Sequence, residues 1–442
     1  MSNVNIKSTW NRPFVKTEKA DEKCNLLNQI IGEKEGIVSK VRKPVNIAFV
    51  FDISGSMESC VASVKHNHAP QMMFNRGLNG TTINSWIAQS SAIGYGKSKL
   101  QLVKEAALIA LSNINENDVV SVVTFGSEAK VLLKGVKGSE KALITSVIQG
   151  IKCDGMTALF DGWRAGAQCV AENMREGFLN RVLLLTDGQA NMGITRPDDI
   201  CSSVRSLSDT DVTTSVFGVG NDYNEDLLQA MGESGDGNYY YIQSEADFEE
   251  MFVHEFYGIM NIVGKKVRLT FEGKGWSNLE LLNAFVKDEN GAYRLPNLTT
   301  VNPVDILFEG LPIEQDASIS ITVSYEKDDG SRVQITKSSK LDIVNDRKDA
   351  YVNQEVLDKV VMIKVANKKQ ESIRQLDMGN MDAARQMLEG ARGLLAGASA
   401  AVSSTQSASL NSLNTSLLSG DTKHFRKSAL YESYNVRNNK EK

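Results

Sequence analysis

The feature that most constrains the fold is an alternation of two patterns between residues 44 and 262. Short β-branched apolar runs predict strands at 45–51, 118–125, 181–186 and 213–220, and helical periodicity between them predicts helices at 99–114, 139–151, 158–174 and 247–260. Strands that are apolar throughout are buried on both faces, as in a mostly parallel sheet with helices on both sides. We therefore predict a doubly wound, mostly parallel α/β domain at 44–262, with its functional crevice at the carboxyl ends of the strands.

The other segments predict smaller units around this domain. Alternating strand patterns predict a β-sandwich at 263–347, to which residues 1–43 could add strands. Residues 348–420 predict an antiparallel helical hairpin, followed by an Ala- and Ser-rich stretch that is either a docked helix or a linker. The segment 421–442 is basic and polar, and we expect it to be a fraying tail.

Composition excludes several classes of function. The formal net charge is -5, from 49 Lys and Arg against 54 Asp and Glu, so no overall basic field favours nucleic acid as a partner. The first residues are polar and the apolar runs are short, which predicts neither a signal peptide nor a membrane span. Five scattered cysteines without CxxC spacing predict free thiols. We therefore expect a cytoplasmic protein.

Oxygen-bearing side chains follow the ends of two predicted strands and precede one predicted helix. Asp52, Ser54 and Ser56 lie on a Gly-containing turn after the first strand, Thr157 lies on the loop before the helix at 158–174, and Asp187 follows the strand at 181–186. Carboxylates and hydroxyls are hard donors, which favour magnesium, manganese or calcium over zinc. Each element alone is a weak signal, because Asp and Ser are also common in loops and helix caps.

Together these residues resemble the von Willebrand factor A domain and its metal-ion-dependent adhesion site, over residues 44–262. The resemblance implies that Ser54, Ser56 and Thr157 are hydroxyl ligands of Mg²⁺, or of Mn²⁺ or Ca²⁺, and that Asp52 and Asp187 ligate it directly or through water. It also implies that the last ligand is a Glu or Asp of a protein partner. The expected function is a non-enzymatic, intracellular protein interaction module that acts as an adaptor or scaffold.

The sequence departs from that family beside the predicted metal site. The family's first helix normally starts just after the serine motif, but here its opening appears at 96–100, so residues 57–95 are an insertion. We expect this long segment to be an ordered lid over the ligand-binding rim, with a mobile loop as the alternative. Within it, His66 and His68 form a poor zinc site, and residues 91–98 only partly match a phosphate-binding loop.

Two other functions remain open on the sequence alone. In the first, the chain is a structural or assembly scaffold in which the metal only stabilises the fold; the helical hairpin, whose turn and second helix resemble one tetratricopeptide-like repeat, favours this. In the second, Asp52 is the nucleophile of a magnesium-dependent phosphatase-like hydrolase. That chemistry normally needs a second acid two residues later, where this chain has Ser54. Partner, pathway and oligomeric state stay open.

Overall fold

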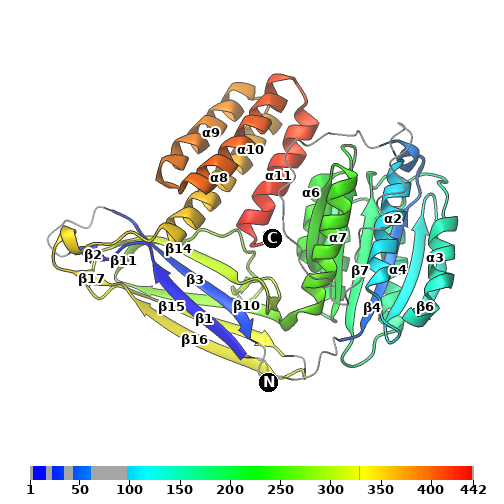
Figure 1. Ribbon diagram of the computed structural model, residues 1–442, viewed down its shortest axis with the longest axis horizontal. Helices are drawn as coiled ribbons and strands as arrows, with labels where there is room; N and C mark the ends of the chain where they lie inside the picture. Colours follow the sequence, from blue (N-terminus) through cyan, green and yellow to red (C-terminus); the bar gives the residue numbers. More distant parts are fainter. Residues whose placement is uncertain (1–2, 16–21, 34–42, 61–96, 328, 441–442) are drawn as a thin grey trace.

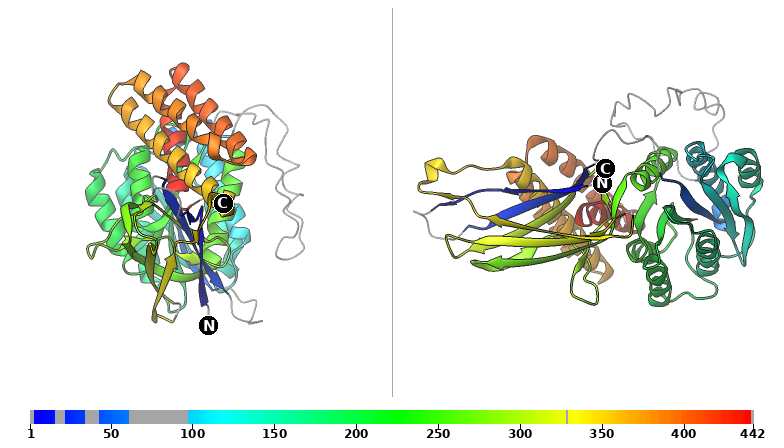
Figure 2. Two further views of the ribbon diagram at one scale, coloured as in Figure 1. Left: turned by 90° about the vertical axis from the view of Figure 1, so that its left-hand side faces the viewer. Right: turned by 90° about the horizontal axis from the view of Figure 1, so that it is seen from below.

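The computed structural model describes residues 3–15, 22–33, 43–60, 97–327 and 329–440. An α/β domain and a β-sandwich lie at opposite ends of the molecule, and a group of helices packs between them (Figures 1 and 2). The chain enters the sandwich first, passes through the α/β domain, and returns to the sandwich through β10 before it forms the helices. The α/β domain therefore interrupts the sandwich in the sequence.

The α/β domain is built on a six-stranded sheet in the order β6-β5-β4-β7-β8-β9. All neighbouring strands pair in parallel except β6, which is an antiparallel edge strand. This confirms the predicted doubly wound fold. The strand bounds are β4 (Val45–Asp52), β5 (Val119–Phe125), β6 (Ala129–Lys137), β7 (Leu179–Thr186), β8 (Val212–Val219) and β9 (Asp236–Ile242).

Three helices cover each face of this sheet, so the strand residues are buried on both sides. One apolar cluster joins the sheet to α2 (Lys99–Ser112), α3 (Lys141–Gly150) and α7 (Glu245–Met260). The other joins it to α4 (Leu159–Glu172), α5 (Pro197–Ser208) and α6 (Glu225–Ser234). The described helices include none with both the length and the apolar character that a membrane crossing needs.

The sandwich packs two antiparallel sheets face to face around one apolar cluster. Strands from the first 43 residues, β1 and β3, lie in the first sheet, in the order β1-β3-β14-β11, and β3 pairs with β14. The second sheet has the order β12-β10-β15-β16, with β13 also on β10. The bounds are β1 (Asn3–Trp10), β3 (Cys24–Glu33), β10 (Ile262–Lys274), β11 (Trp276–Leu281), β12 (Tyr293–Arg294), β13 (Leu298–Thr299), β14 (Val304–Pro312), β15 (Ser318–Glu326) and β16 (Arg332–Lys340), with a separate short pair of β2 (Phe14–Val15) and β17 (Ile343–Val344).

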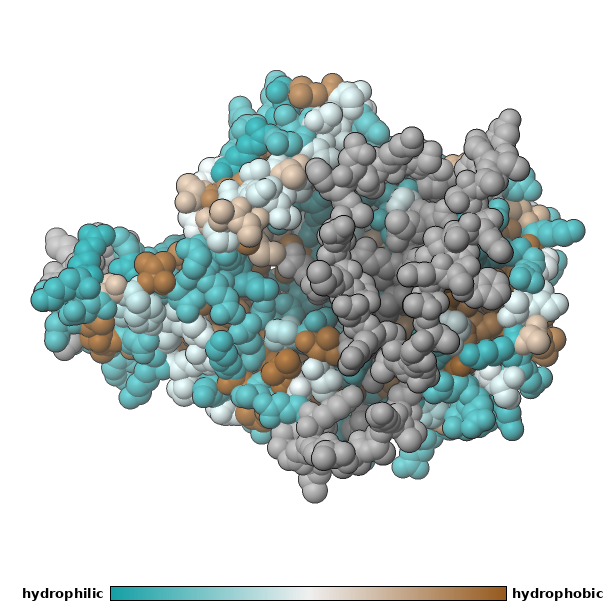
Figure 3. Space-filling model, in the orientation of Figure 1, coloured by the Kyte–Doolittle hydropathy of each residue, from teal (hydrophilic) through white to brown (hydrophobic). Residues whose placement is uncertain are grey.

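Four helices follow the sandwich: α8 (Gln354–Asp377), α9 (Met381–Leu394), α10 (Ala400–Leu418) and α11 (Thr422–Arg437). Helices α8 and α9 form the hairpin, and α8 also buries Val356, Val360 and Ile363 against the first sheet of the sandwich. The Ala- and Ser-rich stretch is helix α10, docked through its leucines on the other helices. In the view of Figure 3, the coloured surface is mostly hydrophilic, with hydrophobic residues in small separate groups.

The expectation that residues 421–442 form a fraying tail is wrong, because residues 422–437 form helix α11. Lys427 is buried, donates a hydrogen bond to the Tyr223 carbonyl oxygen at 2.7 Å, and lies 3.7 Å from the centre of the Tyr223 ring. Arg426 pairs with Glu225 at 2.6 Å. Arg426 and Lys427 are therefore paired with Glu225 of the α/β domain instead of being solvated.

Helix α11 also contacts the sandwich and the other helices. The carbonyl oxygen of Arg437, its last residue, accepts a hydrogen bond from the Ala284 amide at 3.1 Å, and its apolar residues complete the core with α8 and α10. Tyr434 is buried against the edge of the Tyr239 ring, with 5.8 Å between the ring centres. Figure 1 shows α11 between the helical group and α6 of the α/β domain. The helix therefore ties the three parts of the molecule together.

We predict that replacing Tyr434 with Ala lowers the free energy of unfolding by about 3–5 kcal/mol, because a buried ring at this junction is lost and a cavity remains. The change is measured by chemical denaturation of the full chain. The matched control is Tyr434→Phe, which keeps the ring and its contact with Tyr239 and should change stability by less than about 1.5 kcal/mol. Equal stability of the Ala variant and the unmodified protein would contradict a structural role for α11.

Candidate metal centre

The five predicted site residues meet at one edge of the α/β sheet. Asp52 is the last residue of β4, Ser54 and Ser56 follow it in a 3-10 turn (Gly55–Glu58), and Asp187 follows β7. Thr157 lies just before α4. Strands β4 and β7 pair in parallel, with Phe51 opposite Leu185, so their carboxyl ends lie side by side. The sheet itself brings the two carboxylates together.

Hydrogen bonds link the hydroxyls to the carboxylates. Ser54 Oγ and Ser56 Oγ are 3.0 Å apart, and Ser56 Oγ donates to Asp187 Oδ1 at 2.7 Å. Gly188 lies between the remaining two groups: a Cβ at this position would be 3.0 Å from Thr157 Oγ1 and 3.3 Å from Asp52 Oδ2. Hydrogen bonds thus join Ser54, Ser56 and Asp187, and Thr157 and Asp52 lie on either side of Gly188, the residue that follows Asp187.

The two carboxylates are fully buried, which is costly for negative charge. Burial raises the pKa of Asp52 to about 6, although hydrogen bonds from the Thr186 and Ser54 groups oppose the rise, and the nearby charge of Asp187 adds to it. The site thus holds a carboxylate whose charged form is poorly stabilised by its own surroundings. A bound cation would stabilise that charged form.

Two residues of the site were not predicted from the sequence. Thr186 Oγ1 donates to Asp52 Oδ2 at 2.5 Å, and the Lys99 ammonium lies 2.6 Å from Asp187 Oδ2. Thr186 ends a predicted strand directly before Asp187, and this position could have identified it as a site residue from the sequence. Lys99 begins α2 and was interpreted only as a helix start, because its sequence position gives no indication that its side chain reaches Asp187.

The donor set fits a hard divalent cation. Each carboxylate oxygen has two lone pairs, so the bonds from Ser56, Thr186 and Lys99 still leave acceptor positions on Asp52 and Asp187. Oxygen donors of this kind suit magnesium, manganese or calcium. Within the described ranges, no cluster of three or more His, Cys, Asp or Glu side chains could hold a metal. Any site at this edge therefore depends on the serine and threonine hydroxyls as well.

Most of the predicted insertion at 57–95 lies outside the described residues, so the expectation of a lid is not tested. His66, His68 and residues 91–96, which gave only weak matches to a zinc site and a phosphate loop, also lie outside them. The described residues on its two sides lie next to each other. Cys60 and Ser98 form an isolated antiparallel bridge, and the Lys99 amide donates to the Ser59 carbonyl oxygen at 2.9 Å. Helix α2 therefore starts beside the serine turn in space. Cys24 and Cys169 are buried free thiols, and Cys153 and Cys201 are partly buried free thiols.

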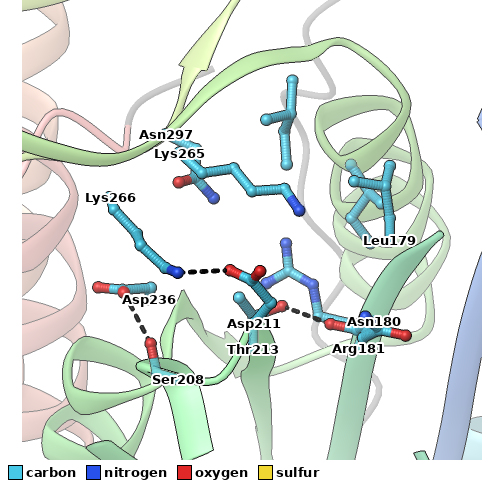
Figure 4. Close-up of a pocket in the computed structure, with 12 residues that line it drawn as sticks. Leu179, Asn180, Arg181, Ser208, Asp211, Thr213, Asp236, Lys265, Lys266 and Asn297 are labelled. Carbon is cyan, nitrogen blue, oxygen red and sulfur yellow. Dashed lines mark hydrogen bonds and ion pairs between the residues drawn. The ribbon is translucent and has the colours of Figure 1, made fainter. Parts of the chain in front are cut away.

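A hollow lies at the opposite end of the strands from the candidate metal centre, at the amino ends of β7 and β8, against β10 (Figure 4). Its acidic residues are already paired: Asp211 with Lys266 at 3.1 Å, and Asp236 with Ser208 at 2.6 Å and with Arg294 at 3.1 Å. We interpret it as a seam between the α/β domain and the sandwich.

Comparisons with known proteins agree with the fold. The family model for the von Willebrand factor type A domain matches residues 87–254, a range that includes Thr157 and Asp187 but begins after Asp52, Ser54 and Ser56. The chain is 31% identical over 175 residues to the uncharacterized protein YfbK of Escherichia coli (strain K12), covering 39% of this chain and 30% of YfbK. It is 25% identical over 216 residues to human inter-alpha-trypsin inhibitor heavy chain H3, covering 47% of this chain and 20% of that protein.

The similarity in structure extends over the whole chain. The solved structure of von Willebrand factor type A from Catenulispora acidiphila matches 98% of this chain and 96% of its own length, with a TM-score of 0.63 and 14% identity. At that identity the match shows the fold alone, including the sandwich and the helices. YfbK and the human heavy chain H3 are each matched over less than a third of their own length. Residues 87–254 are thus similar to the von Willebrand factor type A domain, and the chain has an α/β fold of that type joined to a β-sandwich and a C-terminal group of helices.

Proposed function

We propose that this chain is a non-enzymatic, cytoplasmic adaptor that binds an acidic side chain of a protein partner through a divalent cation, Mg²⁺ above all. Ser54, Ser56 and Thr157 would supply hydroxyl oxygens, and Asp52 and Asp187 would supply carboxylate oxygens. The observation that carries the proposal is the placement of these five side chains beside the carboxyl ends of β4 and β7. Hydrogen bonds join Ser54, Ser56 and Asp187, and Asp52 and Thr157 lie next to Gly188. When bound, the cation would offer a Lewis-acidic position for one more oxygen ligand.

The charges around the site support an anionic partner. Asp52 and Asp187 carry two negative charges, and Lys99 adds one positive charge in contact with Asp187. A divalent cation would therefore leave the site with a net charge of about +1 by simple summation of formal charges. A carboxylate of the partner would neutralise that charge, whereas a neutral ligand would not.

The geometry disfavours the hydrolase. A nucleophilic Asp52 would have to reach a substrate, yet its side chain is fully buried, and its two oxygens accept hydrogen bonds from the Ser54 amide at 2.8 Å and from Thr186. The scaffold remains the second candidate. It is favoured by α11, which contacts the α/β domain, the sandwich and the helices at once. In that case partners would bind elsewhere and the cation would only stabilise the sheet edge.

We predict that replacing Ser54 and Ser56 together with Ala weakens Mg²⁺ or Mn²⁺ binding by more than about tenfold, because direct ligands are removed. Isothermal titration calorimetry on the full chain measures the affinity, and thermal unfolding in chelator shows whether the variant is folded. The control is Ser59→Ala, since the Ser59 hydroxyl donates to the Ser56 carbonyl oxygen and, among the described residues, contacts none of the five proposed ligand side chains. Wild-type affinity in the double variant would contradict the metal site.

We also predict that a protein partner is captured by the full chain in Mg²⁺ but neither in excess chelator nor by the Ser54→Ala/Ser56→Ala variant. Once it is identified by mass spectrometry, replacing one exposed Glu or Asp of the partner by Gln or Asn should abolish binding, because the neutral amide cannot compensate the charge of the cation. Capture that persists in chelator would favour the scaffold instead.

A further inference from the structure

Lys99 occupies a position that the proposed metal chemistry does not require. Its ammonium lies 2.6 Å from Asp187 Oδ2, and the lysine side chain is 5% exposed. The other oxygen of the same carboxylate accepts the hydrogen bond from Ser56. Asp187 thus connects the Lys99 ammonium to Ser56, one of the proposed metal ligands.

The surroundings of Lys99 hold its side chain in place. Lys99 is the first residue of α2, whose N-cap Ser98 accepts from the Gln101 amide at 3.2 Å, and its own amide donates to Ser59. On the other side lies Gly220, with a φ of +73°, where a Cβ would be 3.0 Å from Lys99 Cε. The helix start directs the lysine into the site, and the glycine leaves room for its methylene groups.

The Lys99 ammonium and a divalent cation bound at Asp187 would repel each other. In the structure Lys99 compensates one buried carboxylate, which would otherwise be an unpaired charge. A dication on the same carboxylate would repel the ammonium a few ångströms away, in a buried region where screening by salt is weak. Compensation of Asp187 by Lys99 and binding of a dication to Asp187 therefore oppose each other.

We propose that Lys99 is a built-in counter-ion that competes with the divalent cation for Asp187: it stabilises the site without metal and lowers the affinity of the site for metal. This inference rests on the proposed metal site. It makes the cation exchangeable, because the protein does not depend on it to compensate Asp187. It also predicts two opposite changes when the ammonium is removed.

The test replaces Lys99 with Met, which keeps the length of the side chain but not its charge. Mn²⁺ affinity, measured by isothermal titration calorimetry on the full chain, should rise by about tenfold or more, because a positive charge near the dication is lost. The melting temperature in chelator should fall by several degrees, because Asp187 is then buried without a counter-ion. Saturating Mn²⁺ should restore most of that loss.

The matched control is Lys97→Met, which removes a positive charge two residues away that pairs with Glu105 at 2.7 Å. It should leave Mn²⁺ affinity within about twofold of the unmodified chain. Lys99→Gln, which keeps a hydrogen-bond donor without the charge, is the second variant if the Met protein does not fold, and it should show the same gain in affinity.

The outcomes separate the two proposals. An unchanged or weaker Mn²⁺ affinity in both Lys99 variants, with normal binding by the unmodified chain, would overturn the competition and leave the metal site standing. Absence of Mn²⁺ binding to the unmodified chain would overturn both. A gain in affinity together with a loss of stability in chelator would support the counter-ion.

Discussion

The parallel pairing of β4 with β7 is the interaction on which the candidate site depends. It aligns the end of β4, where Asp52 is the last residue, with the end of β7, which Asp187 follows. Both carboxylates therefore lie beside the start of α2 and the loop before α4. Both strands are buried throughout, so their register is fixed by apolar contacts on two faces. The core of the domain therefore stabilises a cluster of buried charge that would not form by itself.

Much of this could be predicted from the sequence, for identifiable physical reasons. Apolar runs predicted the strands that are buried on both faces. Their ends predicted where Asp52 and Asp187 would lie, and the start of the next helix predicted the position of Thr157. Strand β6 was not predicted because its side chains are largely exposed at the sheet edge, and β9 was not because its tyrosines do not form an aliphatic run. Lys99 was not predicted as part of the site because only the folded chain brings it to Asp187.

Helix α11 shows that the structure of the C-terminal segment, too, depends on distant contacts that its sequence does not reveal. Its basic residues suggested a solvated tail, because a sequence shows charges without their partners. In the fold, Lys427 is buried on Tyr223, and Arg426 and Lys427 both pair with Glu225. Two segments that are far apart in the sequence thus neutralise each other. Such long-range pairs decide whether a charged segment is docked or free, and local patterns carry no information about them.

The interruption of the sandwich by the α/β domain has a consequence for synthesis of the chain. Strand β3 is made early, but its partner β14 follows only after the whole α/β domain has been translated. Until then the β1–β3 hairpin has an open edge of unpaired backbone groups, which is a template for association with other chains. The α/β domain can fold as a unit during this interval, since domains generally fold as they emerge from the ribosome. The sandwich is therefore the part of this protein in which slow translation or high expression would promote aggregation.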